Sequence, residues 1–237
     1  MLLPLLMALA APIRSRVARG LAYGPGAGRT IEVHTPVGAD GEAPVVVMFK
    51  PCDRRAGHIL AARGLVVMVA GRSGGWGGPG ALDDAAKACA WAREHAAEHG
   101  GDPGRLFVFG HAEGGGVAAR LALEPRWLAS VGLEGVLRGA VGVLGLYELG
   151  VEGAPQVSPD APPMLLLGGR KDGGERDRST GALAERLRVA GAEVAEIRVP
   201  GLEPPPFHRL VDALRQRLMA LDEIERFIRL HSLELAG

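Results

Sequence analysis

Short apolar runs alternate with longer helical stretches along most of the chain, and this alternation limits the folds that the sequence can adopt. Continuous apolar runs of this kind are typical of strands that are buried on both faces of a sheet. The predicted strands are Thr30–Thr35, Val45–Phe49, Leu65–Ala70, Leu106–Phe109, Val141–Leu144, Met164–Leu167 and Val194–Val199, and the predicted helices are Gly57–Arg63, Leu82–His99, Glu113–Leu123, Thr180–Ala190 and His208–Leu218. The order predicts an α/β fold with a mainly parallel central sheet and helices on both faces.

Length and charge exclude some functions. The chain has 237 residues and 47% apolar residues, which suits a single domain with a sizeable core. Its 27 basic and 27 acidic residues cancel, so we expect no nucleic-acid partner. The connection from Tyr147 to Pro163 is the one long stretch without periodicity, and it is too short for a folded cap domain.

The N-terminal segment from Met1 to Pro12 is apolar, and Ala8-Leu9-Ala10 resembles a signal cleavage site. The first positive charge, Arg14, follows the apolar run, and the run is shorter than the roughly 20 residues that cross a bilayer. We therefore expect residues 1–20 to be an apolar and basic segment that docks on the protein or on a membrane surface, ahead of one domain at 21–237. This favours a cytoplasmic or loosely membrane-associated protein without a transmembrane span, with secretion as the alternative.

The most specific local pattern is the stretch Leu106–Gly116, in which an apolar strand passes through Gly110-His111-Ala112-Glu113-Gly114 into a helix. This is the layout of a nucleophile elbow, G-x-S-x-G, in which small flanking residues permit a strained strand-to-helix turn. Alanine stands where that pattern has serine.

With its surroundings, this stretch resembles the bacterial esterase and lipase branch of the α/β-hydrolases, which includes feruloyl-esterase-like and carboxylesterase-like proteins. The resemblance extends from Leu21 to Gly201 in the order of the family. The matching segments are Leu21–Pro25, Val45–Phe49, Leu60–Gly64, Ala81–Asp84, Gly100–Pro103, Gly110-His111, Leu137–Val141, Pro163–Leu167 and Val199–Gly201. It implies an α/β-hydrolase fold without a cap domain.

The resemblance also implies where a serine, a histidine base and an orienting carboxylate would stand. The nucleophile position is Ala112, whose methyl group cannot attack a carbonyl, and the acid position is Asp172. The histidine position, counted without a gap, is Pro204. The nearest alternative base is His208, which three prolines, Pro204–Pro206, displace by favouring an extended segment.

The loop that shapes the oxyanion hole in the family also differs in this chain. The family has a His-Gly run after the strand at Val45–Phe49, whereas this chain has Lys50-Pro51-Cys52-Asp53. Pro51 has no backbone N–H to donate. Lys50 is interpreted as a solvated charge or as an anion contact in place of the histidine.

Together these departures favour a non-catalytic pseudoenzyme, since a serine-to-alanine change made only to trap a substrate would leave the base and the oxyanion loop intact. We expect a retained pocket for a small ester-like molecule or a partner, lined by Lys50, Pro51, Trp76, His111 and Glu113. The alternative is a divergent hydrolase of small carboxylic esters or amides that uses other residues. Neither hypothesis requires a cofactor or a metal.

Three further motifs have ordinary explanations. His95 and His99 have the spacing of a zinc-binding pair, but we interpret them as the end of a helix, where histidine suits the helix dipole. The run Gly75–Gly80 contains G-x-G-x-x-G, which we interpret as the rim of a pocket with Trp76 as a contact or lid side chain rather than as a nucleotide site. Cys52 and Cys89 are interpreted as reduced and buried, with a disulfide between them as the alternative.

The C-terminal run Leu218–Leu230 has charges interleaved with apolar residues and predicts an amphipathic helix. Packing against the body of the domain is the preferred explanation of its apolar face, and partner binding is the alternative.

Overall fold

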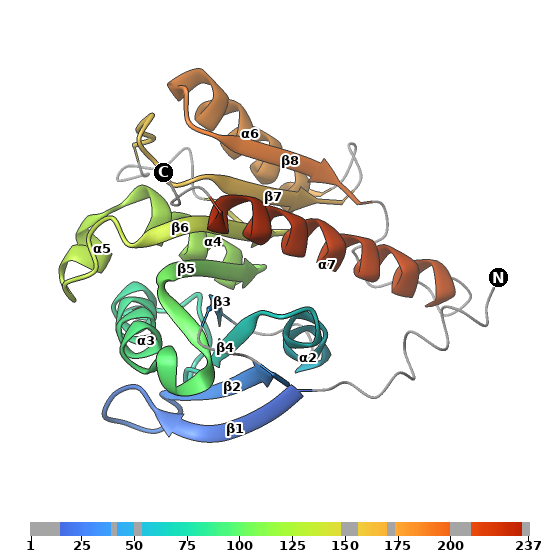
Figure 1. Cartoon of the computed structure of the whole chain (residues 1–237). Helices are drawn as coiled ribbons and strands as arrows, with labels where there is room; N and C mark the ends of the chain where they lie inside the picture. Colours follow the sequence, from blue (N-terminus) through green and yellow to red (C-terminus); the bar gives the residue numbers. More distant parts are fainter. Residues whose placement is uncertain are drawn as a thin grey trace.

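The computed structural model describes residues 15–38, 42–49, 54–147, 156–169, 174–199 and 210–233, with the backbone alone for 54–55 and 210–218. In these ranges eight strands form one sheet in the order β1-β2-β4-β3-β5-β6-β7-β8 (Figure 1). The strands are β1 (Ser15–Ala22), β2 (Thr30–Pro36), β3 (Ala43–Phe49), β4 (Val66–Ala70), β5 (Gly101–His111), β6 (Leu137–Val143), β7 (Met164–Gly168) and β8 (Val194–Arg198).

The sheet is parallel from β4 through β3, β5, β6 and β7 to β8, while β2 runs antiparallel to both β1 and β4. The central strands are buried because both of their faces carry apolar side chains: residues 45–49 of β3 are fully buried, as are residues 106–108 of β5.

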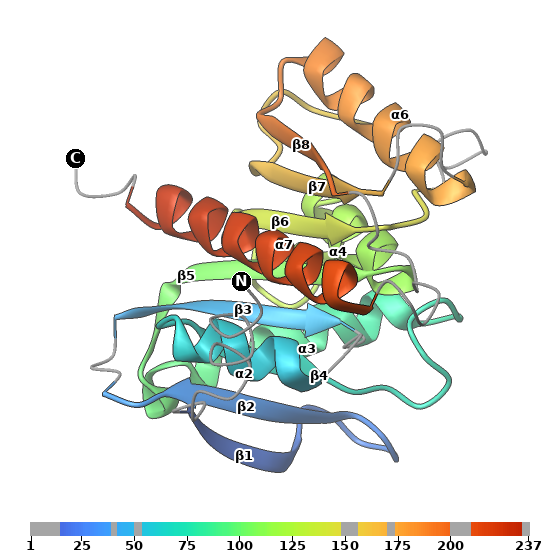
Figure 2. The same ribbon diagram turned by 90° about the vertical axis from the view of Figure 1, so that its right-hand side faces the viewer.

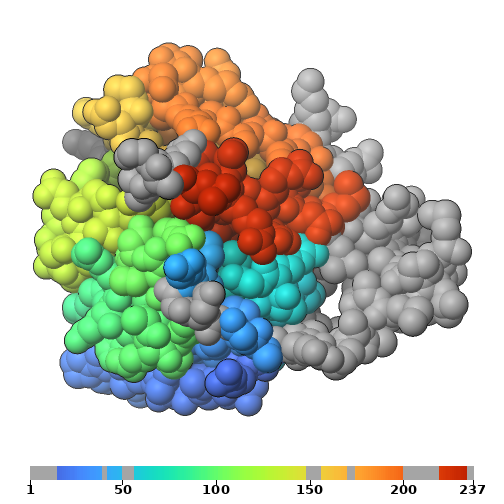
Figure 3. Space-filling model, viewed as in Figure 1, coloured from blue at the N-terminus to red at the C-terminus, as the bar shows by residue number. Residues whose placement is uncertain are grey.

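Helices cover both faces of the sheet (Figures 1 and 2). One core cluster joins the sheet to α3 (Ala81–His95), α4 (Glu113–Leu123), α5 (Arg126–Ala129) and α6 (Glu175–Ala190). The second joins the opposite face to α2 (Arg54–Ala62) and α7 (Leu210–Ser232). On this second face α7 lies across the surface beside α2 (Figure 3), and Arg63, just after α2, pairs with Asp222 and Glu225 of α7.

The predicted fold class is confirmed, but several elements differ from their predicted bounds. Ser15–Ala22 form β1 in the main sheet, so the strand continues across the boundary expected at residue 20. β6 begins at Leu137 rather than at Val141. α3 ends at His95, and a short 3-10 turn, η1 (Ala97–His99), follows it. The two helical stretches predicted near the C-terminus form one continuous helix, α7.

The C-terminal helix was predicted to pack against the body of the domain, and its buried face supports this. Ile224, Phe227 and Ile228 of α7 belong to the core cluster on the second face of the sheet. In the ranges given above, no helix has the length and apolar character that a bilayer span requires.

Candidate functional site

The turn at Ala112 joins β5 directly to α4 and has an unusual backbone. Ala112 has φ 55° and ψ −119°, a conformation that L-residues rarely adopt. Its N–H donates to the carbonyl of Val143 at 2.9 Å, and its own carbonyl accepts from the N–H of Gly115 at 3.0 Å. The side chain is 6% exposed. The turn is therefore held by β6 on one side and by the first turn of α4 on the other.

Two glycines make this turn sterically possible. A Cβ at Gly110 would overlap the backbone of Gly114. A Cβ at Gly114 would overlap the carbonyl of Phe49 at the end of β3. The start of α4 thus packs against β5 and β3 at a distance that only glycine allows, which explains the glycine spacing found in the sequence.

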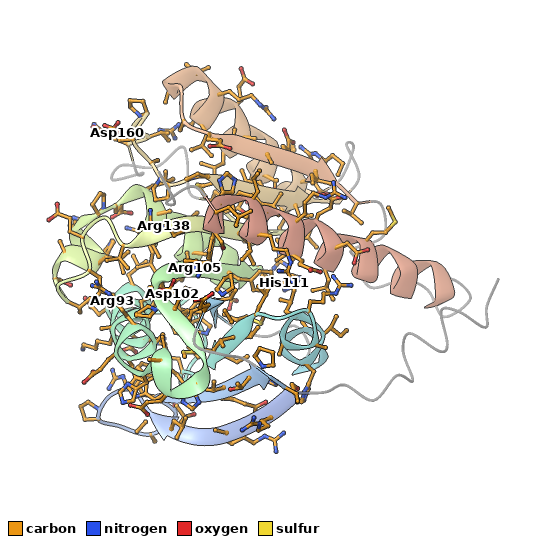
Figure 4. The ribbon with its side chains drawn as sticks, viewed as in Figure 1. Arg93, Asp102, Arg105, His111, Arg138 and Asp160 are labelled. Atoms are coloured by element: carbon orange, nitrogen blue, oxygen red, sulfur yellow. The ribbon has the colours of Figure 1, made fainter. Side chains whose placement is uncertain are left out.

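His111 is the last residue of β5 and lies at the carboxyl end of the sheet, as Figure 4 shows. Asp102 and Arg105 lie toward the opposite end of the same strand, where Arg105 Nε donates to the Asp102 carboxylate at 2.6 Å. Burial raises the pKa of Asp102, but hydrogen bonds from Arg105 and from the N–H of Gly104 outweigh it and hold the pKa below its usual range. This ion pair is structural and is separated from the Ala112 turn by the length of β5.

The loop after β4 is held by a buried carboxylate, Asp84, in the first turn of α3. Asp84 accepts from Arg29 Nε at 2.8 Å and from Arg72 Nε at 2.7 Å. Arg72 also donates to the carbonyls of Gly75 and Pro79, so one guanidinium fixes both ends of the glycine-rich loop. Burial raises the pKa of Asp84, but the hydrogen bonds from Arg72 and Arg29 outweigh it, and the net pKa lies below its usual value.

Trp76 lies inside this loop but does not project from it as a lid. Its side chain is 3% exposed, and its ring lies 4.9 Å from that of Phe49, centroid to centroid. The indole therefore anchors the loop to the end of β3, and only part of it borders the cavity described next.

A cavity of about 620 Å³ extends along α4, on the face of the sheet that carries α3 and α6. The 76–80 loop and Glu113 border it near the Ala112 turn, while Leu123 and Trp127 border it at the far end of α4. A Cβ at Gly77 would lie 3.3 Å from Cδ of Glu113, so glycine leaves room for that carboxylate at the helix start. A volume of this size suits a small organic molecule.

The structure brings some predicted site residues together and does not describe others. Trp76 and Glu113 border the cavity. Ala112 and His111 are adjacent in sequence but are not among its described lining residues. The remaining predicted positions lie outside the described residues: Lys50, Pro51, Cys52, Asp53, Asp172, Pro204 and His208.

The predicted histidine pair, His95 at the end of α3 and His99 in η1, packs beside Trp91. The His95 ring stacks on Trp91 at 4.2 Å between centroids, and its Nδ1 lies 2.9 Å from the Trp91 carbonyl. His99 belongs to the 3-10 turn, and burial lowers its pKa. Across the described part of the chain no three His, Cys, Asp or Glu side chains form a metal-binding group. Cys89 is buried and free.

Sequence reasoning missed three residues of the site. Arg29 and Arg72 hold Asp84, but the sequence signal was limited to an arginine after a strand and an aspartate in a helical first turn. Tyr147 borders the cavity from the segment after β6, and its ring occupies the space beside Gly142 and Gly145 that side chains there would fill. Burial raises the pKa of Tyr147.

Comparisons with known proteins agree with this architecture. A family model described as the alpha/beta hydrolase fold matches residues 76–144, which include the glycine-rich loop and the Ala112 turn. A search of curated proteins finds no match. Among solved structures, an esterase from Pseudomonas putida is similar with a TM-score of 0.69 and 20% identity, covering 97% of this chain and 88% of the other. An esterase from Pyrobaculum calidifontis is similar with a TM-score of 0.72 and 20% identity, covering 98% and 90%.

The chain therefore has the α/β-hydrolase fold. The fold that was predicted from the resemblance is confirmed, and an alpha/beta hydrolase enzyme from a deep-sea metagenome library is similar as well (TM-score 0.72, 16% identity, covering 93% of this chain and 99% of the other).

Proposed function

We propose that this α/β-hydrolase-fold protein is a pseudoenzyme that binds a small ester-like molecule or a partner without hydrolysing it. The observation that carries the proposal is the backbone at Ala112: the strained strand-to-helix turn of a nucleophile elbow holds a methyl group where a hydroxyl would be needed. The cavity beside the turn supports retained binding. The proposed pocket residues are Trp76 and Glu113, which border the cavity, together with Lys50 and Pro51, while His111 is proposed at the turn itself beside Ala112.

The second candidate is a divergent hydrolase of small carboxylic esters or amides. Glu113 favours it, because this carboxylate directly follows the turn and borders the cavity. Without a nucleophilic serine, such an enzyme would have to use a carboxylate or an activated water.

Two assays on the purified protein separate the candidates. A serine-reactive fluorophosphonate is expected to leave the chain unlabelled, and p-nitrophenyl acetate and butyrate are expected to turn over no faster than the buffer blank. Serine elsewhere in the chain could react slowly, so a heat-denatured sample is the control. Turnover that saturates with substrate and disappears in Glu113→Gln would establish the divergent hydrolase instead.

The rescue variant Ala112→Ser is expected to hydrolyse p-nitrophenyl acetate barely above the blank. A serine hydroxyl needs an adjacent base, and loss of one triad member can reduce the rate about 10⁶-fold, nearly as much as loss of all three. Restoring one member alone therefore gains almost nothing.

The double variant Ala112→Ser/Pro204→His should be faster than the single variant, since Pro204 is the gap-free base position. It should stay below a true esterase, because a missing oxyanion donor reduces the rate about 10²–10³-fold and Pro51 remains. Brisk turnover by Ala112→Ser alone would mean that a general base is already in place, and His208 would be the first candidate for that base.

A further inference from the structure

The outer face of α7 carries apolar side chains that lie outside both core clusters. Met219 and Leu230 of this helix are 53% and 57% exposed, and Leu233, directly after it, is 73% exposed. These are three of the six large apolar side chains that are exposed in the described part of the chain. The opposite face of α7 packs on the sheet, and Figure 3 shows the helix on the surface. Exposed apolar side chains that gather on one helix mark an interaction surface.

Four residues form a row along this outer face, and they are Met219, Glu223, Arg226 and Leu230. Their separations of four, three and four positions keep them on one side of a helix that has about 3.6 residues per turn. Arg226 Nη1 lies 3.2 Å from Glu223 Oε2, so the middle of the row is an ion pair. In chain order the row is therefore apolar, acidic, basic and apolar.

This order is symmetrical about the midpoint of the row. When a second copy of α7 lies antiparallel on the first, Met219 faces Leu230 of the second copy, and a two-fold axis repeats the contact. Glu223 likewise faces Arg226 of the second copy, which gives two further contacts of opposite charge. In a parallel pair each of these charges would face a charge of its own sign, which is unfavourable. The charges therefore select the antiparallel arrangement.

We propose that the outer face of α7 is the contact between two copies of this chain, related by a two-fold axis at the midpoint of the row. Leu233 lies beside the row and adds apolar area at each end of the contact. A contact made by one helix from each copy is small, so we expect a dimer that dissociates in the micromolar range. The contact lies on the opposite face of the sheet from the cavity, so this inference does not depend on the proposed function.

Sedimentation equilibrium of the purified chain tests the dimer. Between about 1 and 200 µM, we expect the average mass to rise from the monomer value of 24.7 kDa toward twice that value. Leu230→Glu should weaken the dimer at least about tenfold, because it places a carboxylate in the apolar contact. Val189→Glu is the matched control: Val189 of α6 is 79% exposed on the other side of the sheet, and its substitution should leave the dimer unchanged.

Two charge variants test the antiparallel arrangement. Glu223→Arg makes both charges of the row basic, and Arg226→Glu makes both acidic. Each variant alone should dimerise at least about tenfold more weakly than the wild type, because like charges then face each other across the contact. An equimolar mixture of the two variants should dimerise again, since every basic residue then faces an acidic one. High salt should weaken the mixed dimer, because these charges lie at the surface.

A chain that stays monomeric at every concentration would overturn the proposal, as would a dimer that Leu230→Glu leaves intact or that Val189→Glu disrupts. A mixture of the two charge variants with an average mass no higher than that of either variant alone would overturn it as well. Flotation with phosphatidylcholine vesicles tests another occupant. A monomer that binds these vesicles, and that Leu230→Glu releases, would assign the face to a membrane surface instead. Thermal unfolding of each variant verifies that it is folded.

Discussion

At the scale of single residues, the most informative position is Ala112. A non-glycine residue at φ 55° persists only where the surroundings determine it. Here they consist of the hydrogen bond from Ala112 to Val143 and the glycine contacts at Gly110 and Gly114. The geometry of the turn is thus built by neighbours rather than by the side chain that occupies it, so it survives whether that side chain is serine or alanine.

Relief of this strain should be measurable. Ala112→Gly is expected to raise the free energy of unfolding by about 1 kcal/mol, since a strained backbone of this type costs about 1–3 kcal/mol and glycine loses roughly 0.5–1 kcal/mol through extra chain entropy. Urea unfolding measures it. The control is Ala182→Gly, at an exposed position within α6, which should lower the free energy of unfolding by about 0.5–1 kcal/mol. Equal decreases in the free energy of unfolding for Ala112→Gly and Ala182→Gly would show that Ala112 is unstrained.

At the scale of elements, the sequence predicts the helices and strands that have a strong apolar pattern and misses the ones that lack such a pattern. β3 and α4 lie close to their predicted bounds, because one is continuously apolar and the other begins at a glycine-flanked turn. β1 contains Arg16, Arg19 and Gly20, and it is an edge strand with an exposed face, so it has neither an apolar run nor strict alternation. Its place in the sheet comes from pairing with β2, which no local pattern reveals.

The contact between β2 and α2 predicts a pH effect on stability. His34 of β2 is fully buried, and its ring meets His58 of α2 edge-on at 4.4 Å between centroids. The other facing groups are Glu32, 3.0 Å from His34 Nε2, and Ser15, whose Oγ lies 2.9 Å from His58 Nδ1; Arg19 pairs with Glu32. Burial lowers the pKa of His34, and His58 lowers it further, against the opposing effect of Glu32.

The sign of the effect follows from linkage. Below the unfolded pKa of about 6.5, the unfolded chain binds a proton that folded His34 resists, so stability falls as the pH drops from 7 to 5. The slope from one proton is at most about 1.4 kcal/mol per pH unit. His34→Phe should unfold with a shallower pH dependence over this range by chemical denaturation. Parallel curves for the two proteins would exclude His34 as the source.

At the scale of the whole molecule, the sequence predicts the fold better than the site. The alternation of runs and the glycine-flanked turn determine the sheet and its central crossover, whereas the cavity is formed by α3, α4, α6 and the segment after β6. Their relative placement depends on tertiary packing, and motif spacing pointed only to Glu113 and to the 76–80 loop with Trp76 among its lining residues. Asp172, Pro204 and His208 lie outside the described residues and remain predictions.

Asp84 connects parts of the molecule that are distant in sequence, and its loss should affect global stability. Its carboxylate is 3% exposed and bonds to Arg29 before β2 and to Arg72 after β4. Asp84→Asn should lower the free energy of unfolding by about 3 kcal/mol at pH 7, since breaking a buried pair leaves charges uncompensated. The exposed neighbour Asp83 offers the control, because Asp83→Asn should change the free energy of unfolding by less than about 0.5 kcal/mol.

The same pair of variants has an expected pH dependence. The folded pKa of Asp84 is depressed, so its contribution is complete above the unfolded value near 3.8 and is lost as the pH falls through the folded pKa. The difference between wild type and Asp84→Asn should therefore shrink in strongly acidic urea titrations. A difference that stays constant down to pH 2 would contradict the assigned role.

The strand order has a consequence for how the chain is made. β2 pairs with β4 and not with β3, so the sheet neighbour of the N-terminal ribbon lies about thirty residues further along. During synthesis the β1–β2 ribbon leaves the ribosome with one edge of β2 unsatisfied, and an isolated two-stranded ribbon is at best marginally stable in water. The open edge of β2 is paired only after β3, α2 and β4 have formed. The β1–β2 ribbon thus lacks its sheet partner until β4 has been translated, and during that interval the open edge of β2 is exposed to pairing with another copy.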